Sequence, residues 1–145
     1  MRISIASDHG GFEQKQQLAS HLEGKGLGVV DRGPATEESV DYPDFPKLVC
    51  EDIQSGEADL GILVCGTGIG MAIAANKMAG IRAANATCVQ FAHLAREHND
   101  ANVLTLSGRF VTPSENEAIV DEFISTPFGG DRHARRVGKI MALEG

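Results

Sequence analysis

Short runs of β-forming residues alternate with segments of helical periodicity along the whole chain. Five such runs span residues 2–6, 27–31, 60–64, 81–84 and 103–106. Strands that alternate with helices form a mostly parallel sheet that helices cover on both faces. The sequence therefore predicts an α/β fold built on a five-stranded parallel sheet.

The length of 145 residues suits one compact domain, and the chain has no internal repeat, low-complexity tract or linker. No leader-like segment follows Met1, and no apolar run approaches the roughly 20 residues that span a bilayer. The three cysteines are odd in number and widely spaced, which fits neither a disulfide framework nor a zinc site. The net charge of -7 argues against a broad nucleic-acid surface. We therefore expect a cytoplasmic protein that binds neither membranes nor nucleic acid.

Local patterns mark the expected helix boundaries. Thr87 with Gln90, and Ser114 with Glu117, have the spacing of capping boxes. Pro46 suits the first turn of a helix over about 45–53. Apolar stripes at helical spacing are formed by Leu18, Ala19 and Leu22 in the first helix, and by Val137, Ile140 and Met141 in a last helix expected over about 133–143.

One apolar run ends at Cys65, and the glycine-rich turn Gly66-Thr67-Gly68-Ile69-Gly70 follows directly before a helical segment. In an open α/β sheet, ligands lie at the carboxyl ends of the strands, where the N–H groups of such a turn can face a bound anion. This position makes Cys65 the best candidate for a reactive group. A buried structural cysteine before an ordinary tight turn explains the segment equally well.

Asp8 and His9 follow the first strand and should share this sheet edge with Cys65. A carboxylate and an imidazole there could bind a sugar hydroxyl and a phosphate, although a helix cap is the simpler role for Asp8. The longest connection, over 32–44, contains Tyr42, which is the only tyrosine. Loops of this length are often functional, but a solvated crossover also explains it.

His98 lies in the last turn of the expected fourth helix, within Glu97-His98-Asn99-Asp100. The helix macrodipole favours a protonated imidazole there, and histidine exchanges protons near neutral pH. A basic residue at a helix end can also serve stability alone. His21 and His93 lie inside helical patterns without an evident charged partner, so we expect surface or packing roles for them.

Basic residues crowd the start of the last helix: Arg132, His133, Arg135, Arg136 and Lys139. Cations at a helix N-terminus oppose the macrodipole, and a bound anion would explain them. Arg132 and Arg136 are four apart and share a face, whereas Arg135 points about 100° away from Arg136. The first pair could form a phosphate fork, and the alternatives are a solvated basic face or salt bridges to this acidic protein.

Arg109 follows the fifth strand and could join an anion site at the carboxyl edge of the sheet.

Several familiar phosphate-binding patterns are absent. A dinucleotide fingerprint needs glycine where this chain has Met71 and an acidic residue near Ala86. No Gly-Lys-Ser/Thr sequence of a Walker A loop is present. A cysteine phosphatase would have arginine in place of Met71, so phosphocysteine chemistry is disfavoured.

Seven blocks together resemble the type B ribose-5-phosphate isomerases, in the same order and over essentially the whole chain. They are Ser7-Asp8-His9-Gly10-Gly11, Asp41-Tyr42-Pro43, the segment Cys65-Gly66-Thr67-Gly68-Ile69-Gly70, Ala74-Ala75-Asn76-Lys77, Gly80-Ile81-Arg82-Ala83, the segment 98–104, and Arg132-His133 with Arg136. The resemblance implies a Rossmann-like three-layer αβα sandwich, with residues 1–145 forming one sugar-phosphate isomerase domain. It also implies that D-ribose 5-phosphate and D-ribulose 5-phosphate interconvert without metal or cofactor, as a step of the pentose phosphate pathway.

By position, the resemblance makes Cys65 the base that moves a proton between C1 and C2. His98 becomes the acid-base group that opens the furanose ring. The turn from Gly66 to Gly70, with Thr67 as a further catalytic residue, would stabilise the enediolate. The substrate-binding residues implied in the same way are Asp8 at the sugar, Asn99 at the reacting end, Tyr42 along the pocket wall, and His9, Arg109, Arg132 and Arg136 at the phosphate.

The resemblance further implies a homodimer, or a dimer of dimers, whose pockets lie at the interface. His98, Asn99 and Arg109 would then come from the partner subunit. One departure is Asp131, where many relatives have glycine before the Arg-His pair. A carboxylate beside Arg132 could weaken phosphate binding or hold the arginine in place.

Two other functions compete with this interpretation. A hexose phosphate isomerase on the same scaffold would act on allose 6-phosphate or galactose 6-phosphate, and a non-catalytic module would only bind a phosphosugar. Retention of Cys65, His98 and Tyr42 favours the pentose enzyme over the galactose branch. A module that only binds sugar phosphates would need neither Cys65 nor His98.

Overall fold

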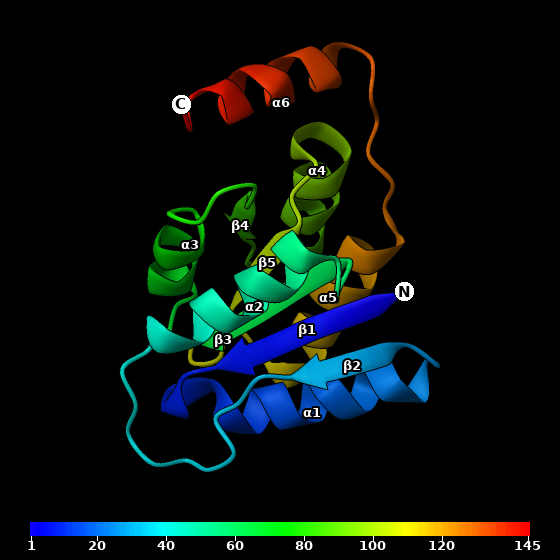
Figure 1. Cartoon of the computed structure of the whole chain (residues 1–145). Helices are drawn as coiled ribbons and strands as arrows, with labels where there is room; N and C mark the ends of the chain where they lie inside the picture. Colours follow the sequence, from blue (N-terminus) through cyan, green and yellow to red (C-terminus); the bar gives the residue numbers. More distant parts are fainter.

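The computed structural model describes all of residues 1–145, and its centre is one five-stranded sheet (Figure 1). All pairings are parallel, and the strands lie in the order β2-β1-β3-β5-β4. The strands are β1 (Arg2–Ser7), β2 (Gly28–Asp31), β3 (Leu60–Cys65), β4 (Ala83–Asn85) and β5 (Val103–Ser107). The predicted five-stranded parallel sheet is therefore confirmed, with strand boundaries that differ by at most two residues.

Helices cover both faces of this sheet, so the three-layer αβα sandwich is confirmed as well (Figure 1). The larger core buries Leu18 and Leu22 of one helix and Phe123 of another against one face. The smaller core packs Val49 and Met71 against the other face. The helices are the 3-10 helix η1 (His9–Gly11), α1 (Phe12–Gly24), α2 (Asp44–Ser55), α3 (Ile69–Ala75), α4 (Val89–Asn99), α5 (Pro113–Ser125) and α6 (Arg132–Ala142).

The last helix, α6, lies away from the sheet and packs against α4 (Figure 1). Val137 is buried, but Ile140 remains 47% exposed. The apolar stripe predicted for this helix is thus only partly covered within one chain. None of the helices has both the length and the apolar character that crossing a bilayer requires.

Both predicted capping boxes are wrong. α5 is capped by Thr112, whose Oγ1 accepts the N–H of Glu115 at 3.2 Å. Pro113 occupies the first helical position, where its fixed φ suits a helix start, so the cap lies two residues before Ser114. α4 begins after Cys88, which makes no capping hydrogen bond through its side chain.

The chain leaves the neighbouring strands β1 and β3 toward opposite faces of the sheet. α1 follows β1 into the larger core, while α3 follows β3 into the smaller core. A ligand crevice forms at the carboxyl edge where such connections diverge. The N–H of Asp8 donates to the carbonyl of Val64 at 3.1 Å, so the segments after β1 and β3 lie side by side there.

Candidate active site

Cys65 is the last residue of β3 and lies at this carboxyl edge, between the ends of β1 and β5. Its sulfur accepts the N–H of Gly68 at 3.1 Å, and its side chain is nearly buried. Cys50 offers a contrast, because burial raises the pKa of that thiol to about 12. Cys50 therefore matches a structural cysteine, whereas Cys65 has an N–H donor aimed at its sulfur.

The turn after Cys65 depends on two glycines. Gly68 has φ +84, and a Cβ there would collide with the side chain of Asn85. At Gly70, a Cβ would lie only 2.8 Å from the ring of Tyr42. The aromatic ring from the long 32–43 connection therefore packs directly onto the first turn of α3, beside the crevice.

Asp8 and His9 directly follow β1, the strand that neighbours β3, at the same edge of the sheet. Asp8 Oδ1 accepts the N–H of Gly11 at 2.8 Å, so Asp8 does cap the short helix η1. His9 Nδ1 accepts the N–H of Val40 at 3.2 Å. This contact leaves Nε2 to carry the proton of the neutral imidazole and to act as a donor.

Arg109 extends the same edge. Its guanidinium carbon lies 3.5 Å from the position of a Cβ on Gly66, and its backbone N–H donates to the Gly66 carbonyl at 3.1 Å. Arg109 therefore lies beside Cys65 of its own chain, and a partner subunit is not needed to supply it. The first half-site consists of Asp8, His9, Tyr42, the segment 65–70 and Arg109.

A second group of predicted residues gathers around the end of α4. His98, Asn99, Arg132, His133 and Arg136 line a hollow of about 250 Å³ and form the second half-site. Arg135 is not part of its wall, as the helical spacing predicted. Both residues of the proposed arginine fork therefore face one hollow.

The imidazoles of His98 and His133 stack in the second half-site, with ring centroids 4.3 Å apart and planes inclined by 15°. Partial burial is the main reason that the pKa of His133 lies below its ordinary 6.5, and the nearby charges of His98, Arg132 and Arg136 lower it further. His133 was not among the predicted site residues, although its basic neighbours had set it apart. Close contact with His98 brings it into the site.

The two half-sites lie at opposite edges of the sheet. α4 leads into the start of β5, where the N–H of Gly61 donates to the carbonyl of Asn102 at 2.9 Å. Gly61 lies near the start of β3 and Cys65 at its end, so strand length alone separates these two residues by roughly 13 Å. His98 precedes Asn102 at the amino edge and therefore does not face Cys65 of the same chain.

His21 and His93 are partly exposed, and each has carboxylate partners that were not evident from the sequence. His21 Nε2 lies 2.8 Å from Asp121 Oδ1. His93 Nδ1 and Nε2 each lie 2.7 Å from a carboxylate oxygen, of Glu122 and Glu97 respectively. Hydrogen bonds with Glu122 and then Glu97 raise the pKa of His93 above its ordinary 6.5.

Asp131 adopts φ 48 immediately before α6 and makes no capping hydrogen bond through its side chain. This positive φ favours glycine. It gives a physical reason for the glycine that the resemblance implies at this position. The structure has no group of three or more His, Cys, Asp or Glu side chains arranged to hold a metal ion.

Known proteins of similar sequence match almost the whole chain. A sequence model of the family described as Ribose/Galactose Isomerase matches residues 3–140. A probable ribose-5-phosphate isomerase B of Mycoplasma pneumoniae is 52% identical over 98% of this chain and 94% of its own length.

Solved structures are equally similar. Ribose-5-phosphate isomerase B of Clostridium thermocellum is 51% identical and has a TM-score of 0.98, covering 99% of this chain and 97% of its own. The Mycoplasma genitalium protein, solved with bound ribulose-5-phosphate, is 49% identical and has a TM-score of 0.94 over 99% of this chain and 95% of its own. The similarity therefore covers nearly the full length of each protein.

Proposed function

The chain belongs to the ribose/galactose isomerase family, and within it we propose that the protein interconverts D-ribose 5-phosphate and D-ribulose 5-phosphate. Relatives named ribose-5-phosphate isomerase B support this activity, since they match almost the whole chain. The observation that carries the proposal is the Cys65 sulfur, which lies at the β1–β3 crevice and accepts an N–H from the following turn.

Cys65 acts as the base. As a thiolate, it removes the proton from C2 of the open-chain aldose, and the electron pair of that bond forms the double bond of a C1–C2 enediolate. The thiol then returns the proton to C1, while the proton of the C2 hydroxyl passes to O1, which leaves a hydroxyl on C1 and the carbonyl on C2. The N–H donors of the 66–70 turn stabilise the charge that grows on the substrate oxygens.

Thr67 assists at the reacting end. Its Oγ1 accepts the N–H of Ile69 at 3.1 Å, which fixes the hydroxyl oxygen and leaves the hydroxyl proton to be donated to the substrate. Tyr42 forms the wall of the pocket over Gly70, and Asp8 binds sugar hydroxyls next to the ring oxygen.

His98 opens the furanose ring. It donates a proton to the ring oxygen as the bond from that oxygen to C1 breaks, and the C1 hydroxyl gives its own proton to water, which leaves the C1 carbonyl. His98 lies in the last turn of α4, and its Nε2 is 3.5 Å from Glu97 Oε1. Asn99 contacts the sugar from the same turn.

Two chains form each complete pocket in this proposal. The first half-site of one chain faces the second half-site of its partner, and a two-fold axis generates two equal pockets. Exposed apolar side chains beside the first half-site support a covered surface there, since Ile69, Ile73 and Phe110 are each more than half exposed. His9, Arg109 and the partner's Arg132 and Arg136 then surround the phosphate.

The same proposal places the protein in the cytoplasm. Three free cysteines, one of which must remain reduced to act as a base, suit a reducing compartment.

A substrate panel tests the activity. The purified protein is assayed with ribose 5-phosphate, allose 6-phosphate and galactose 6-phosphate, each with and without a chelator. The expected result is preferred turnover of ribose 5-phosphate that the chelator does not reduce. Preferred turnover of a hexose phosphate would change the substrate assignment, and binding without turnover of any sugar would indicate a non-catalytic module.

A further inference from the structure

The chain turns sharply directly after His98 and Asn99, at Asp100. Asp100 has φ 48 and ψ 42, a left-handed conformation that is costly for a residue with a Cβ. Its N–H donates to the Arg96 carbonyl at 3.2 Å and closes the last turn of α4. Aspartate tolerates this conformation better than most residues, but its carboxylate does more than terminate the helix.

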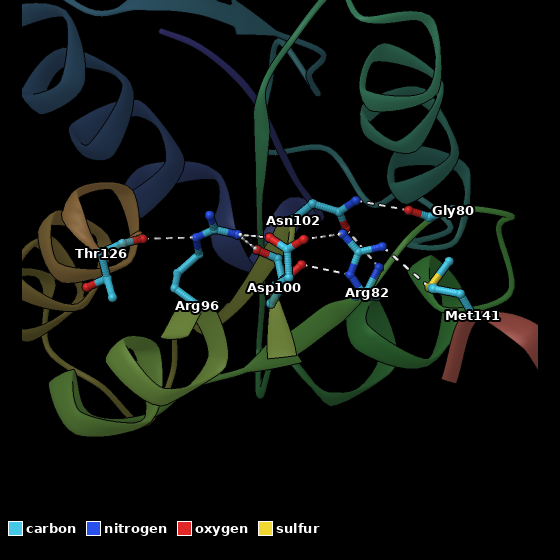
Figure 2. Close-up of polar contacts among 8 residues, drawn as sticks. Gly80, Arg82, Arg96, Asp100, Asn102, Thr126 and Met141 are labelled. Carbon is cyan, nitrogen blue, oxygen red and sulfur yellow. Dashed lines mark hydrogen bonds and ion pairs between the residues drawn. The ribbon is translucent and has the colours of Figure 1, made fainter. Parts of the chain in front are cut away.

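Two arginines converge on Asp100 from opposite sides (Figure 2). Arg96 Nη1 lies 3.1 Å from Oδ1, and Arg82 Nη2 lies 3.4 Å from Oδ2. Arg82 Nε also donates to the Asp100 carbonyl at 2.7 Å. The side chain of Arg82 is only 19% exposed and that of Arg96 only 14%, so both arginines are largely removed from solvent.

Each arginine joins this turn to a different helix (Figure 2). Arg96 donates to the Ala101 carbonyl at 2.6 Å and to the carbonyl of Thr126, which follows α5, at 3.3 Å. Arg82 Nη1 lies 3.4 Å from the sulfur of Met141 in α6.

The backbone of Arg82 is fixed by the same turn. Its N–H donates to Asn102 Oδ1 at 2.8 Å, and Asn102 Nδ2 donates to the Gly80 carbonyl at 2.9 Å. The segment before β4 and the segment before β5 are therefore held together on both sides of the Arg82 side chain.

We propose that Asp100, held between Arg82 and Arg96, is a positioning residue that fixes His98 relative to α6 and so sets the geometry of the second half-site. A helix end needs only a few partners for its last carbonyl groups. The contacts of Asp100 reach further, because Arg82 connects Asp100 to α6, the helix that carries Arg132 and Arg136. The proposal rests on the proposed function, because it assigns the turn a role in placing the ring-opening group.

The chemistry of the two substrates separates positioning from simple stabilisation. Ribose 5-phosphate closes into a furanose through O4 and must be opened before its C2 proton can be removed. Ribulose 5-phosphate has its carbonyl at C2 and its O5 esterified, so it forms no furanose. Exchange of its C1 protons with solvent therefore needs Cys65 and the 66–70 turn, but no ring-opening acid.

The test uses Asp100→Gly, which keeps the left-handed backbone and removes the carboxylate, and the milder Asp100→Asn. The matched control is Asp121→Asn, because Asp121 is 35% exposed against 34% for Asp100 and also has two basic partners, Lys25 and His21. Isomerisation of ribose 5-phosphate and C1 deuterium uptake by ribulose 5-phosphate are measured for each variant and corrected for the folded fraction.

Asp100→Gly is expected to lower kcat for ribose 5-phosphate by about 10- to 100-fold, the range for a small misplacement of a catalytic group. At saturating ribulose 5-phosphate, where weaker phosphate binding does not limit the rate, deuterium uptake should stay near the wild-type rate. Asp100→Asn should have an intermediate kcat, and Asp121→Asn should retain both activities. Parallel loss of both activities in Asp100→Gly, or loss of neither, would overturn the positioning role.

A measurement that does not depend on activity separates this proposal from the proposed function. Amide hydrogen exchange in Asp100→Gly should accelerate over both 96–102 and 132–141, because the carboxylate links the two segments. Acceleration over the first segment alone would reduce Asp100 to a local helix cap. Absence of ribose 5-phosphate turnover in the wild type would refute the proposed function. The hydrogen-exchange result would still test whether Asp100 links the two segments.

Discussion

Two inactive variants should restore activity when they share a dimer. Cys65→Ser removes the thiol from the first half-site, and His98→Gln removes the imidazole from the second. General acid-base groups contribute roughly 10²- to 10⁴-fold, so each variant alone should be nearly inactive. The structure separates Cys65 and His98 to opposite sheet edges, so a hybrid dimer contains one pocket with both groups intact and one with neither.

The size of the recovery follows from this geometry. Random assembly of equal amounts makes half of the dimers hybrids, and each hybrid has one of its two pockets intact. The mixture should therefore regain about one quarter of the wild-type activity, and a hybrid purified through two different tags about one half. Each variant mixed with itself is the control. A purified hybrid without activity would mean that both groups serve a pocket within one chain, which would refute the shared site.

Three further predictions concern the second half-site and its support. Arg136→Ala should raise KM for ribose 5-phosphate far more than Arg135→Ala, because only Arg136 lines the hollow; equal effects in steady-state assays would refute the fork. The pKa of His93 is raised above 6.5, so its stabilising contribution is complete below pH 6.5 and is lost as the pH rises through the folded-state pKa. In denaturant titrations, the difference in unfolding free energy between wild type and His93→Gln should shrink as the pH rises from 6.5 through the folded-state pKa of His93. A difference that stays constant with pH would contradict this prediction. Asp131→Gly should relieve about 1–2 kcal/mol of backbone strain, less about 0.5–1 kcal/mol of added chain entropy in the unfolded state, so thermal melts should show equal or higher stability.

The sequence predicted that Asp8, Cys65 and Arg109 share one edge of the sheet, because that placement depends on strand ends alone. Each of the three lies at or just after the end of a parallel strand, and all such ends meet at one edge. The sequence also predicted a tight glycine-rich turn after Cys65, and Gly68 has the positive φ of such a turn, whereas the packing of Tyr42 on Gly70 was not predicted.

The sequence patterns could not predict contacts between segments that lie far apart in the chain. Glu122 lies 29 positions from His93, and Arg82 lies 18 positions from Asp100, so neither ion pair has a local spacing that predicts it. The cap of α5 was missed because Pro113 starts the helix before Ser114. Ile140 has the helical spacing of a core residue, but it stays exposed because α6 packs mainly against α4.

The central claim is that Cys65 carries the proton between C1 and C2, and solvent exchange tests it most directly. Cys65→Ser is compared with wild type and with Cys88→Ser, which changes an exposed cysteine outside the pocket. Deuterium uptake into the sugar phosphate is followed in deuterated water, with ribose 5-phosphate binding measured separately. The account predicts that Cys65→Ser folds and binds ribose 5-phosphate but loses exchange at C2, while Cys88→Ser exchanges like wild type. Exchange by Cys65→Ser at the wild-type rate would contradict it.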